Sequence, residues 1–209
     1  MIASGPTLST VFFFLVHTPR ALERITHEVR TRFQSVHDIR AGPGLNECNY
    51  LRACVDETMR LVPGVATMLP RVIERGGMVI AGDYYPEGAI VGCSSYALHR
   101  NPFYFHKPDI FLPERWISGN DLLPANMRKA FFPFGHGPRS CSGVHLALAE
   151  LYIVVARAAF MYDMRLAPDA PCCQSSPSGR CTDRQFKSYV GLDLDGPMVQ
   201  FRAREKHQS

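Results

Sequence analysis

The 209-residue chain lacks the sequence features that mark several common classes of protein. No stretch approaches the ~20 apolar residues of a membrane span. The longest candidate, residues 11–16, reads V-F-F-F-L-V. Because no basic residue precedes this run and no small-residue cleavage site follows it, a helix interior explains it better than a signal peptide does. The net charge of +4 comes without a basic run or an aromatic-spaced basic patch, which argues against a nucleic-acid partner.

Cysteine is present, but it forms no recognisable framework. The seven cysteines belong to a chain that is 46% hydrophobic and 20% charged, which is typical of a globular protein and not of a disulfide scaffold. Cys172, Cys173 and Cys181 cluster in a segment rich in Ser, Pro and Gly. We interpret them as exposed loop thiols, with metal binding as a weaker alternative. No internal repeat is visible, and the length predicts one domain or a large part of one.

One cysteine lies in a distinctive setting. Residues 134–143 read F-G-H-G-P-R-S-C-S-G, and an apolar, helix-forming run follows at residues 144–161. Cys141 is therefore expected where a glycine-rich loop enters a helix. The free N–H groups and the positive dipole end of a helix favour the thiolate form of a cysteine at such a position.

The residues around Cys141 favour a flat ligand that carries a carboxylate. Arg139 is a cation that can meet such a group, and Phe134 can cover the apolar side of the sulfur. Three positions without side chains allow close approach to the backbone: Gly135, Gly137 and Gly143. A buried structural cysteine is the simplest alternative. A zinc site is weaker, because only His136 and His145 lie nearby and structural zinc needs four ligands.

Every specified position of this loop matches the haem-thiolate loop of the cytochrome P-450 family, and the chain resembles that family here. The matching residues are Phe134, Gly135, Gly137, Arg139, Cys141 and Gly143. The resemblance implies that Cys141 ligates the iron of haem b and that Arg139 neutralises a haem propionate. It also implies a fold that is mainly α with small β-sheets (α+β).

The predicted N-terminal helix, residues 1–16, resembles the oxygen-activating helix of the same family, whose core pattern is small-Gly-x-acid-Thr. Ala3 and Thr7 are in register, whereas Ser4 replaces the glycine and Pro6 replaces the acid. The resemblance makes Thr7 a catalytic candidate. A helix-cap or turn threonine is an equally good interpretation.

Two pairings of charged residues are expected downstream. Residues 47–61 predict a helix on which Glu57 and Arg60 lie three residues apart on one face. They could form a surface ion pair worth only a few tenths of a kcal/mol. The resemblance implies instead the family's buried Glu-x-x-Arg pair, with Arg115 of the sequence F-L-P-E-R-W as its third member. By the same resemblance Arg71 is a second cation for the propionates, the alternative being a surface arginine on an edge strand.

Local signals place the remaining elements. Thr18 and Pro19 predict the N-cap and first residue of a second helix that runs to about residue 33. The sequence G-P-G at residues 42–44 then breaks the chain, and residues 121–132 are expected to form a loop. Pro86-Glu87-Gly88 predicts a turn, and strands are expected at residues 66–74, 77–81, 89–96, 189–194 and 198–203 in an otherwise irregular tail.

The resemblance covers only the C-terminal part of the family's fold. It divides this partial domain, residues 1–209, into the segments 1–33, 47–61, 66–116, 117–161 and 162–209. The membrane anchor and the early helices of the family would precede them, so we expect a truncated gene model or a remnant gene. The motif spacing most resembles microsomal-type members from fungi. That likeness implies the cytosolic face of the endoplasmic reticulum membrane and a place in fungal secondary metabolism.

The implied reaction inserts one oxygen atom of O2 into a small, apolar organic substrate, with electrons from NADPH through a reductase. Arg128 and Lys129, near the cysteine loop, are expected to face an acidic reductase domain, unless they form an ordinary solvated basic loop. Two other functions stay open. One is a peroxide-isomerising or dehydrating haem-thiolate enzyme, which the loss of the acid at Pro6 favours and Thr7 opposes. The other is a non-catalytic remnant.

Overall fold

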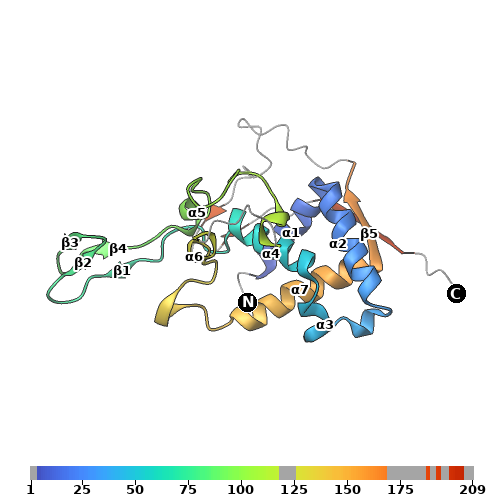
Figure 1. Cartoon of the computed structure of the whole chain (residues 1–209), viewed down its shortest axis with the longest axis horizontal. Coiled ribbons are helices and arrows are strands. Elements are labelled where there is room, and N and C mark those ends of the chain that lie inside the picture. Colours follow the sequence, from blue (N-terminus) through green and yellow to red (C-terminus); the bar gives the residue numbers. More distant parts are fainter. Residues whose placement is uncertain (1–3, 118–125, 169–186, 189–191, 194–197, 205–209) are drawn as a thin grey trace.

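A computed structural model describes residues 4–117, 126–168, 187–188, 192–193 and 198–204. Its body consists of packed helices, and the described residues also form four short two-stranded antiparallel sheets (Figure 1). The prediction of a mainly α fold with small β-sheets is therefore confirmed. Ala3 and the cysteine cluster at residues 172, 173 and 181 lie outside the described residues.

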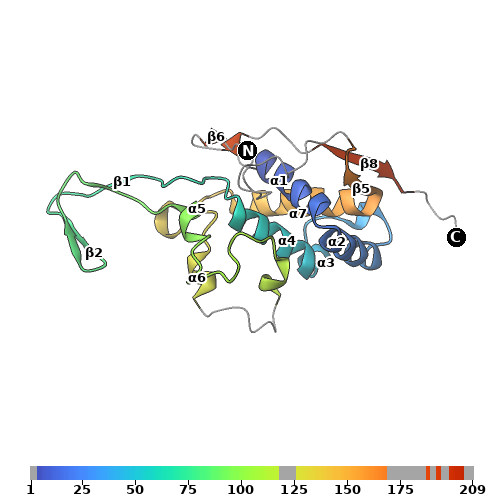
Figure 2. The ribbon, with the colours of Figure 1, turned by 90° about the horizontal axis from the view of Figure 1, so that it is seen from above.

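Four helices build the body: α1 (Ser4–His17), α2 (Pro19–Arg32), α4 (Asn49–Leu61) and α7 (Val144–Met161). α7 packs against the other three, and α1 lies beside both α4 and α7 (Figure 2). The shared core holds fully buried side chains from each helix, among them Val11, Ile25, Leu51 and Val155. The three helices expected at residues 1–16, 18–33 and 47–61 are thus confirmed within the described residues, with small shifts of their ends.

α7 is long and apolar enough to cross a membrane by length and composition, with a mean hydropathy of 1.6 over its 18 residues. This corrects the expectation that no stretch approaches the length of a membrane span and that residues 11–16 are the longest candidate. The indication is weak, because the core helix of a soluble protein passes the same test, and α7 packs against three other helices.

The start of α2 follows the predicted cap only in part. Thr18 occupies the N-cap and Pro19 the first helical position, but the Thr18 side chain makes no cap hydrogen bond. Pro19 is well placed, because the N–H that it lacks has no partner in the first turn of a helix. After α2, the break at residues 42–44 opens a short helix, α3 (Pro43–Asn46), with Gly42 at φ 148° just before it.

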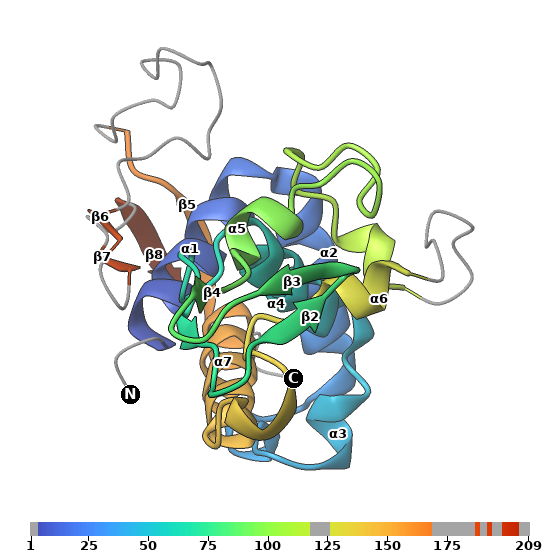
Figure 3. The same ribbon diagram turned by 90° about the vertical axis from the view of Figure 1, so that its left-hand side faces the viewer.

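An arm of short strands projects from the helical body (Figures 1 and 3). It contains β1 (Arg71–Val72), β2 (Met78–Ile80), β3 (Asp83–Tyr85) and β4 (Ile90–Val91). β2 pairs with β3, and β4 pairs with β1 across the base of the arm. The expected strand at residues 66–74 is thus two residues long, and the strand β3 was missed.

The reason for the missed strand is the turn at Ala81 and Gly82, whose φ angles are 52° and 99°. Two central residues with positive φ are typical of a type I′ hairpin turn, which reverses the chain tightly. The turn predicted at Pro86-Glu87-Gly88 is also present, with the amide of Ala89 donating to the carbonyl of Pro86 at 3.2 Å. It leads from β3 to β4 and does not form the β2–β3 hairpin that was missed.

Between the arm and α7, the described residues include several short helices, which corrects two expectations. α5 (Ser95–Leu98) replaces the end of the strand expected at residues 89–96, and the Ser94 hydroxyl caps it by accepting from the amide of Ala97. α6 (Met127–Ala130) lies within the loop expected at residues 121–132. Two 3-10 turns complete the segment, η2 (Pro113–Trp116) and η3 (Gly137–Arg139). A third, η1 (Val36–Asp38), precedes α3.

The C-terminal sheet begins directly after α7. β5 (Tyr162–Leu166) pairs along its length with β8 (Val199–Ala203), so the expectation of an irregular tail after residue 161 was wrong, while the strand at residues 198–203 is confirmed. β6 (Lys187–Ser188) pairs with β7 (Leu192–Asp193). β7 falls in the strand expected at residues 189–194, whose other residues lie outside the described part of the chain.

Candidate functional site: a cysteine loop, a cavity and a buried charge cluster

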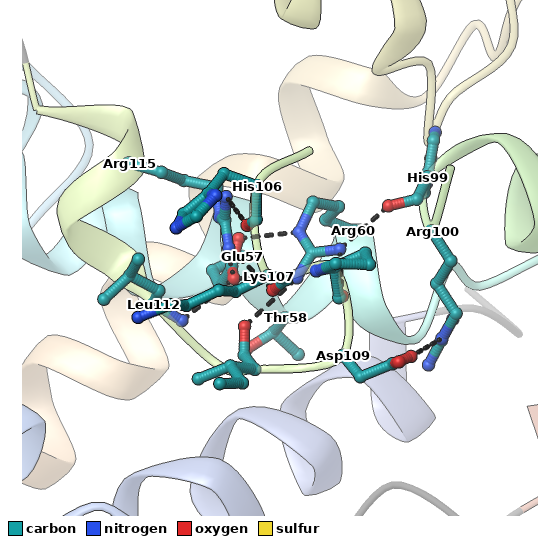
Figure 4. Close-up of polar contacts among 12 residues, drawn as sticks. Glu57, Thr58, Arg60, His99, Arg100, His106, Lys107, Asp109, Leu112 and Arg115 are labelled. Carbon is teal, nitrogen blue, oxygen red and sulfur yellow. Dashed lines mark hydrogen bonds and ion pairs between the residues drawn. The ribbon is translucent and has the colours of Figure 1, made fainter. Parts of the chain in front are cut away.

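The carboxylate of Glu57 is fully buried on α4 and accepts hydrogen bonds from two guanidinium groups (Figure 4). Arg60 donates from Nε and Nη2 to the two carboxylate oxygens, both at 2.9 Å. Arg115 on η2 donates from Nε to Oε1 at 3.1 Å. The indole Nε1 of Trp116 and the amide of Leu112 add two further bonds, each at 2.9 Å. The carboxylate is therefore held by five donors.

The two guanidinium groups also donate hydrogen bonds to backbone carbonyl oxygens. Arg60 donates to the carbonyls of His99, Pro108 and Ile110, and Arg115 donates to those of His106 and Lys107. Burial lowers the pKa of Arg115, while the Glu57 carboxylate acts in the opposite direction. The cluster thus ties the segment 99–116 to α4 through charge-assisted bonds.

The structure therefore brings together Glu57, Arg60 and Arg115, and the surface ion pair that the spacing also allowed is wrong. All three side chains are at most 1% exposed. The sequence prediction missed the donors Leu112 and Trp116. The signal was present, since Trp116 is the only tryptophan of the chain and directly follows Pro-Glu-Arg.

The segment 134–143, which we call the cysteine loop, is closed by backbone hydrogen bonds. The amide of Cys141 donates to the carbonyl of Phe134 at 2.8 Å, and the amide of Ser140 donates to Gly137 at 3.0 Å. Gly135 and Gly137 have φ angles of 76° and 77°, a left-handed region that other residues rarely adopt. A side chain at Gly137 would meet no atom within 4 Å, so its surroundings are open.

Cys141 lies immediately before the start of α7, as the sequence predicted. Gly143 is the N-cap of α7, and the amide of Ala147 donates to its carbonyl at 2.9 Å. Cys141 is exposed and takes part in no disulfide. The alternative of a buried structural cysteine is therefore wrong. Its exposed thiol lies on a cavity wall.

This cavity has a volume of about 1180 Å³ and is formed by segments that are far apart in the sequence. Its lining includes most of the residues that the sequence analysis singled out: Thr7, Arg71, Phe134, Gly135, Arg139, Cys141 and Gly143. Gly137 does not line it. The pocket is large enough for a drug-sized or cofactor-sized ligand, since such pockets are about 300–1,000 Å³.

The charge of the cavity wall is mostly positive. Its cationic side chains come from β1, α6 and the cysteine loop: Arg71, Arg128, Lys129 and Arg139. Glu150 of α7 is the one acidic residue among the described residues of the lining. Arg139 is exposed and makes no hydrogen bond or ion pair with any described residue, so it can pair with an anionic ligand.

The donor set fits a haem group. One cavity is lined by an exposed thiol, by glycine backbone and by cations that can pair with carboxylates. A metal site built from several protein side chains has less support. Within the described parts of the chain, no group of three His, Cys, Asp or Glu side chains could hold a metal ion. The position of Arg128 and Lys129 on this cavity was missed, because the sequence places them before the loop without showing which way α6 faces.

Thr7 lies in the first two turns of α1, is 6% exposed and lines the same cavity as Cys141. It is thus inside the described helix and is not its cap. Pro6 causes no break, because its position in the first turn needs no amide donor, and its carbonyl accepts from the Thr10 hydroxyl at 2.7 Å.

Comparisons with known proteins agree with this geometry. The family model described as cytochrome P450 matches residues 4–177. Three fungal relatives each align with 97% of this chain. They are "Cytochrome P450 monooxygenase" of Gibberella zeae (35% identical) and "Cytochrome P450 monooxygenase AFT11-1" of Alternaria alternata (34% identical). The third is "Cytochrome P450 monooxygenase lcsN" of Purpureocillium lilacinum (35% identical). The chain spans 48%, 41% and 61% of their respective lengths. The chain belongs to the cytochrome P-450 family.

Proposed function

We propose that the chain carries the haem-thiolate site of a monooxygenase that oxidises a small, apolar organic substrate. The observation that supports this most directly is that Cys141, Arg71 and Arg139 line one cavity. A thiol for the iron and cations for the propionates are the groups that haem b requires. The chain spans 48%, 41% and 61% of the lengths of the relatives named above, so the activity of a whole monooxygenase is part of this proposal.

Haem b bound through a thiolate supplies O2 activation and the insertion of one oxygen atom, with electrons from NADPH through a reductase. The residues of the chain prepare the site for this chemistry. Cys141 would donate electron density to the iron as a thiolate, and Phe134 would cover the apolar side of the sulfur. Arg139 and Arg71 would neutralise the propionates, and Gly135 would let the flat ring approach the backbone.

Thr7 of α1 lines the same cavity as Cys141, and the family pattern implies a role for its hydroxyl. The hydroxyl would hydrogen-bond O2 or a water molecule that delivers protons. The buried cluster of Glu57, Arg60 and Arg115 does not take part in the chemistry. It fixes the segments around the cysteine loop, because breaking it would leave buried charges without partners.

The test is a reduced carbon monoxide difference spectrum of the haem-reconstituted chain. The wild type should show the band that is diagnostic of thiolate ligation, and Cys141→Ser should abolish it. Cys93→Ser is a matched control, because Cys93 is also exposed and lines the same cavity. A band that survives in Cys141→Ser would overturn the assignment. Absence of the band in the wild type would favour the non-catalytic remnant.

The electron donor is an NADPH-dependent reductase that docks on the exposed cations Arg128 and Lys129 of α6. Opposite charges speed such docking in a salt-dependent way. We place the full-length protein at the cytosolic face of the endoplasmic reticulum membrane, where this reductase would meet it. Fluorescence microscopy of a tagged full-length protein checks this location.

A second candidate function is the rearrangement or dehydration of a peroxide without O2 or reductase. It is favoured by Pro6, which stands where the family pattern has an acid beside Thr7. Product analysis of the full-length protein separates the two. Turnover with NADPH and reductase supports the monooxygenase, whereas turnover with a lipid hydroperoxide alone supports the alternative.

A further inference from the structure

We propose that His99 is a positioning residue that couples the buried charge cluster to the cysteine loop. The proposal rests on the haem-thiolate function given above, because it concerns how Cys141 is held for that role. His99 is not itself a lining residue of the cavity, although it contacts the lining residue Phe132. It acts through two bonds, one from its backbone and one from its ring.

The backbone of His99 is fixed by the charge cluster. Its carbonyl oxygen accepts from Nη1 of Arg60 at 2.8 Å, and Figure 4 shows this carbonyl directed at the guanidinium group. The residue is fully buried, so no water replaces this bond. The position of the His99 backbone therefore depends on the position of the Arg60 guanidinium group.

The ring of His99 holds the chain that enters the cysteine loop. Its Nε2 accepts from the amide of Phe132 at 3.1 Å. The bonds continue from there: the amide of Gly135 donates to the carbonyl of Phe132 at 2.9 Å, and the amide of Cys141 donates to that of Phe134 at 2.8 Å. Short backbone segments connect these bonds, so a continuous path links Arg60 to Cys141.

The surroundings of the ring fix both its orientation and its tautomer. Phe105, Phe131 and Phe132 surround it with ring centroids 5.2 to 6.3 Å away. A backbone N–H can only donate, so Nε2 is unprotonated and the proton lies on Nδ1. Burial, together with the positive charge of Arg60, lowers the pKa of His99 to about 4, although hydrogen bonding to the backbone of Arg60 and Met59 acts in the opposite direction. The ring is therefore neutral near pH 7.

A residue that only filled this buried space would not need the ring nitrogen Nε2. A polar ring nitrogen is tolerated in this fully buried position because it has a hydrogen-bond partner, the amide of Phe132. An apolar side chain of similar volume would leave that amide without its acceptor. The bond that Nε2 makes to Phe132 is what histidine provides and an apolar residue cannot.

The test compares three variants of the full chain without haem. His99→Leu removes the acceptor, and His99→Gln keeps an acceptor near the position of Nε2. Val29→Ala is a matched control for general destabilisation, because Val29 is also fully buried but lies on α2, away from the path. The measurement is amide hydrogen exchange at Phe132, Gly135 and Cys141.

We expect exchange at these three amides to be on the order of tenfold faster in His99→Leu than in Val29→Ala, because a buried donor loses its acceptor. His99→Gln should restore most of the protection. After haem addition, His99→Leu should show a smaller fraction of thiolate-type carbon monoxide complex than Val29→Ala. Equal exchange in His99→Leu and Val29→Ala would overturn the proposal.

A second measurement does not depend on the variants folding. Nitrogen-15 NMR of the wild-type His99 ring should report the tautomer with the proton on Nδ1, and a proton on Nε2 would overturn the proposal. Failure of the haem-thiolate function gives a different pattern. In that case no protein forms the thiolate complex, while the exchange differences at Phe132, Gly135 and Cys141 remain.

Discussion

Replacing Glu57 by alanine should destabilise the protein far more than any exposed carboxylate replacement would. Glu57 is the centre of the buried charge cluster, and its carboxylate is the shared partner of Arg60 and Arg115. Alanine leaves two guanidinium groups without a counter-ion, and neither is more than 1% exposed. The indole of Trp116 and the amide of Leu112 lose their acceptors as well.

The magnitude follows from the burial of these groups. Removing one partner of a buried ion pair costs about 3–5 kcal/mol, because the remaining charge stays uncompensated. Two stranded cations place Glu57→Ala at the upper end of this range. Since native domains are stable by about 5–15 kcal/mol, the loss is a large share of the total. For a chain of this size it corresponds to a fall in Tm of about 6–20 °C.

Thermal unfolding followed by circular dichroism measures this loss, together with the haem content of the reconstituted protein. Glu114→Ala is the control. Glu114 lies one residue from Arg115, pairs with Arg24 at 3.3 Å and accepts from the Tyr50 hydroxyl at 3.1 Å, while the side chains of Glu114 and Arg24 are 23% and 47% exposed. The exposed pair contributes about 0–1 kcal/mol and the hydrogen bond about 0.5–1.5 kcal/mol, so this variant should lose clearly less stability than Glu57→Ala.

The outcome for haem separates a structural from a chemical role. Glu57→Ala should lower haem incorporation, because the segments held by the cluster frame the cysteine loop. A Glu57→Ala protein with the Tm of Glu114→Ala and full haem content would refute the reasoning. It would mean that the guanidinium groups find other partners or water when the carboxylate is gone.

Three further predictions concern other parts of the chain. The folded pKa of His99, about 4, lies below its unfolded value of 6.5, so the unfolded chain binds more protons and His99 should cost about 3 kcal/mol of stability as the pH falls from 7 to 4. Burial raises the pKa of Asp56 to about 7, which makes the unfolding free energy change with pH in the opposite direction. The check is therefore to compare the pH dependence of the unfolding free energy, measured with urea, between wild type and His99→Gln. The same pH dependence in both proteins would contradict the prediction. Arg128→Glu combined with Lys129→Glu should slow reductase association at low salt in stopped-flow measurements, and an unchanged rate would favour a solvated basic loop. Val79 of the arm is 65% exposed among other exposed apolar residues, which favours association between copies of the chain. Val79→Lys should therefore lower the associated fraction in sedimentation velocity. The same fraction in wild type and variant would show that the arm does not drive association.

The sequence alone was sufficient for features that depend on a few neighbouring residues. The cysteine loop is one, because Gly135 and Gly137 permit left-handed backbone and the apolar run after Gly143 continues as α7. The helices α2 and α4 are others, since their apolar residues recur at helical spacing, whereas α1, which is apolar on most sides, was expected from the family resemblance. The pairing of Glu57 with Arg60 was also readable, because three residues on a helix bring side chains to the same face.

Features that join distant segments were decided by the tertiary structure. Strand β5 looked irregular by itself and became a strand because β8 pairs with it from the far end of the chain. The hairpin β2–β3 was missed, since the turn at Ala81 and Gly82 has a weaker local signal than Pro86-Glu87-Gly88. Short strands depend on their partners more than on their own propensity.

The same division holds for the site. The sequence identified Cys141 and the charged residues, but it could not show that Thr7 and Arg71 share a cavity with the cysteine, or that Arg128 and Lys129 line it too. Nor could it show that Trp116 bonds to Glu57 or that His99 links Arg60 to the cysteine loop. Local sequence determines backbone conformation over a few residues. Which side chains meet across the molecule is set by the packing of α1, α4 and α7, since the shared core fixes where each connecting segment can lie.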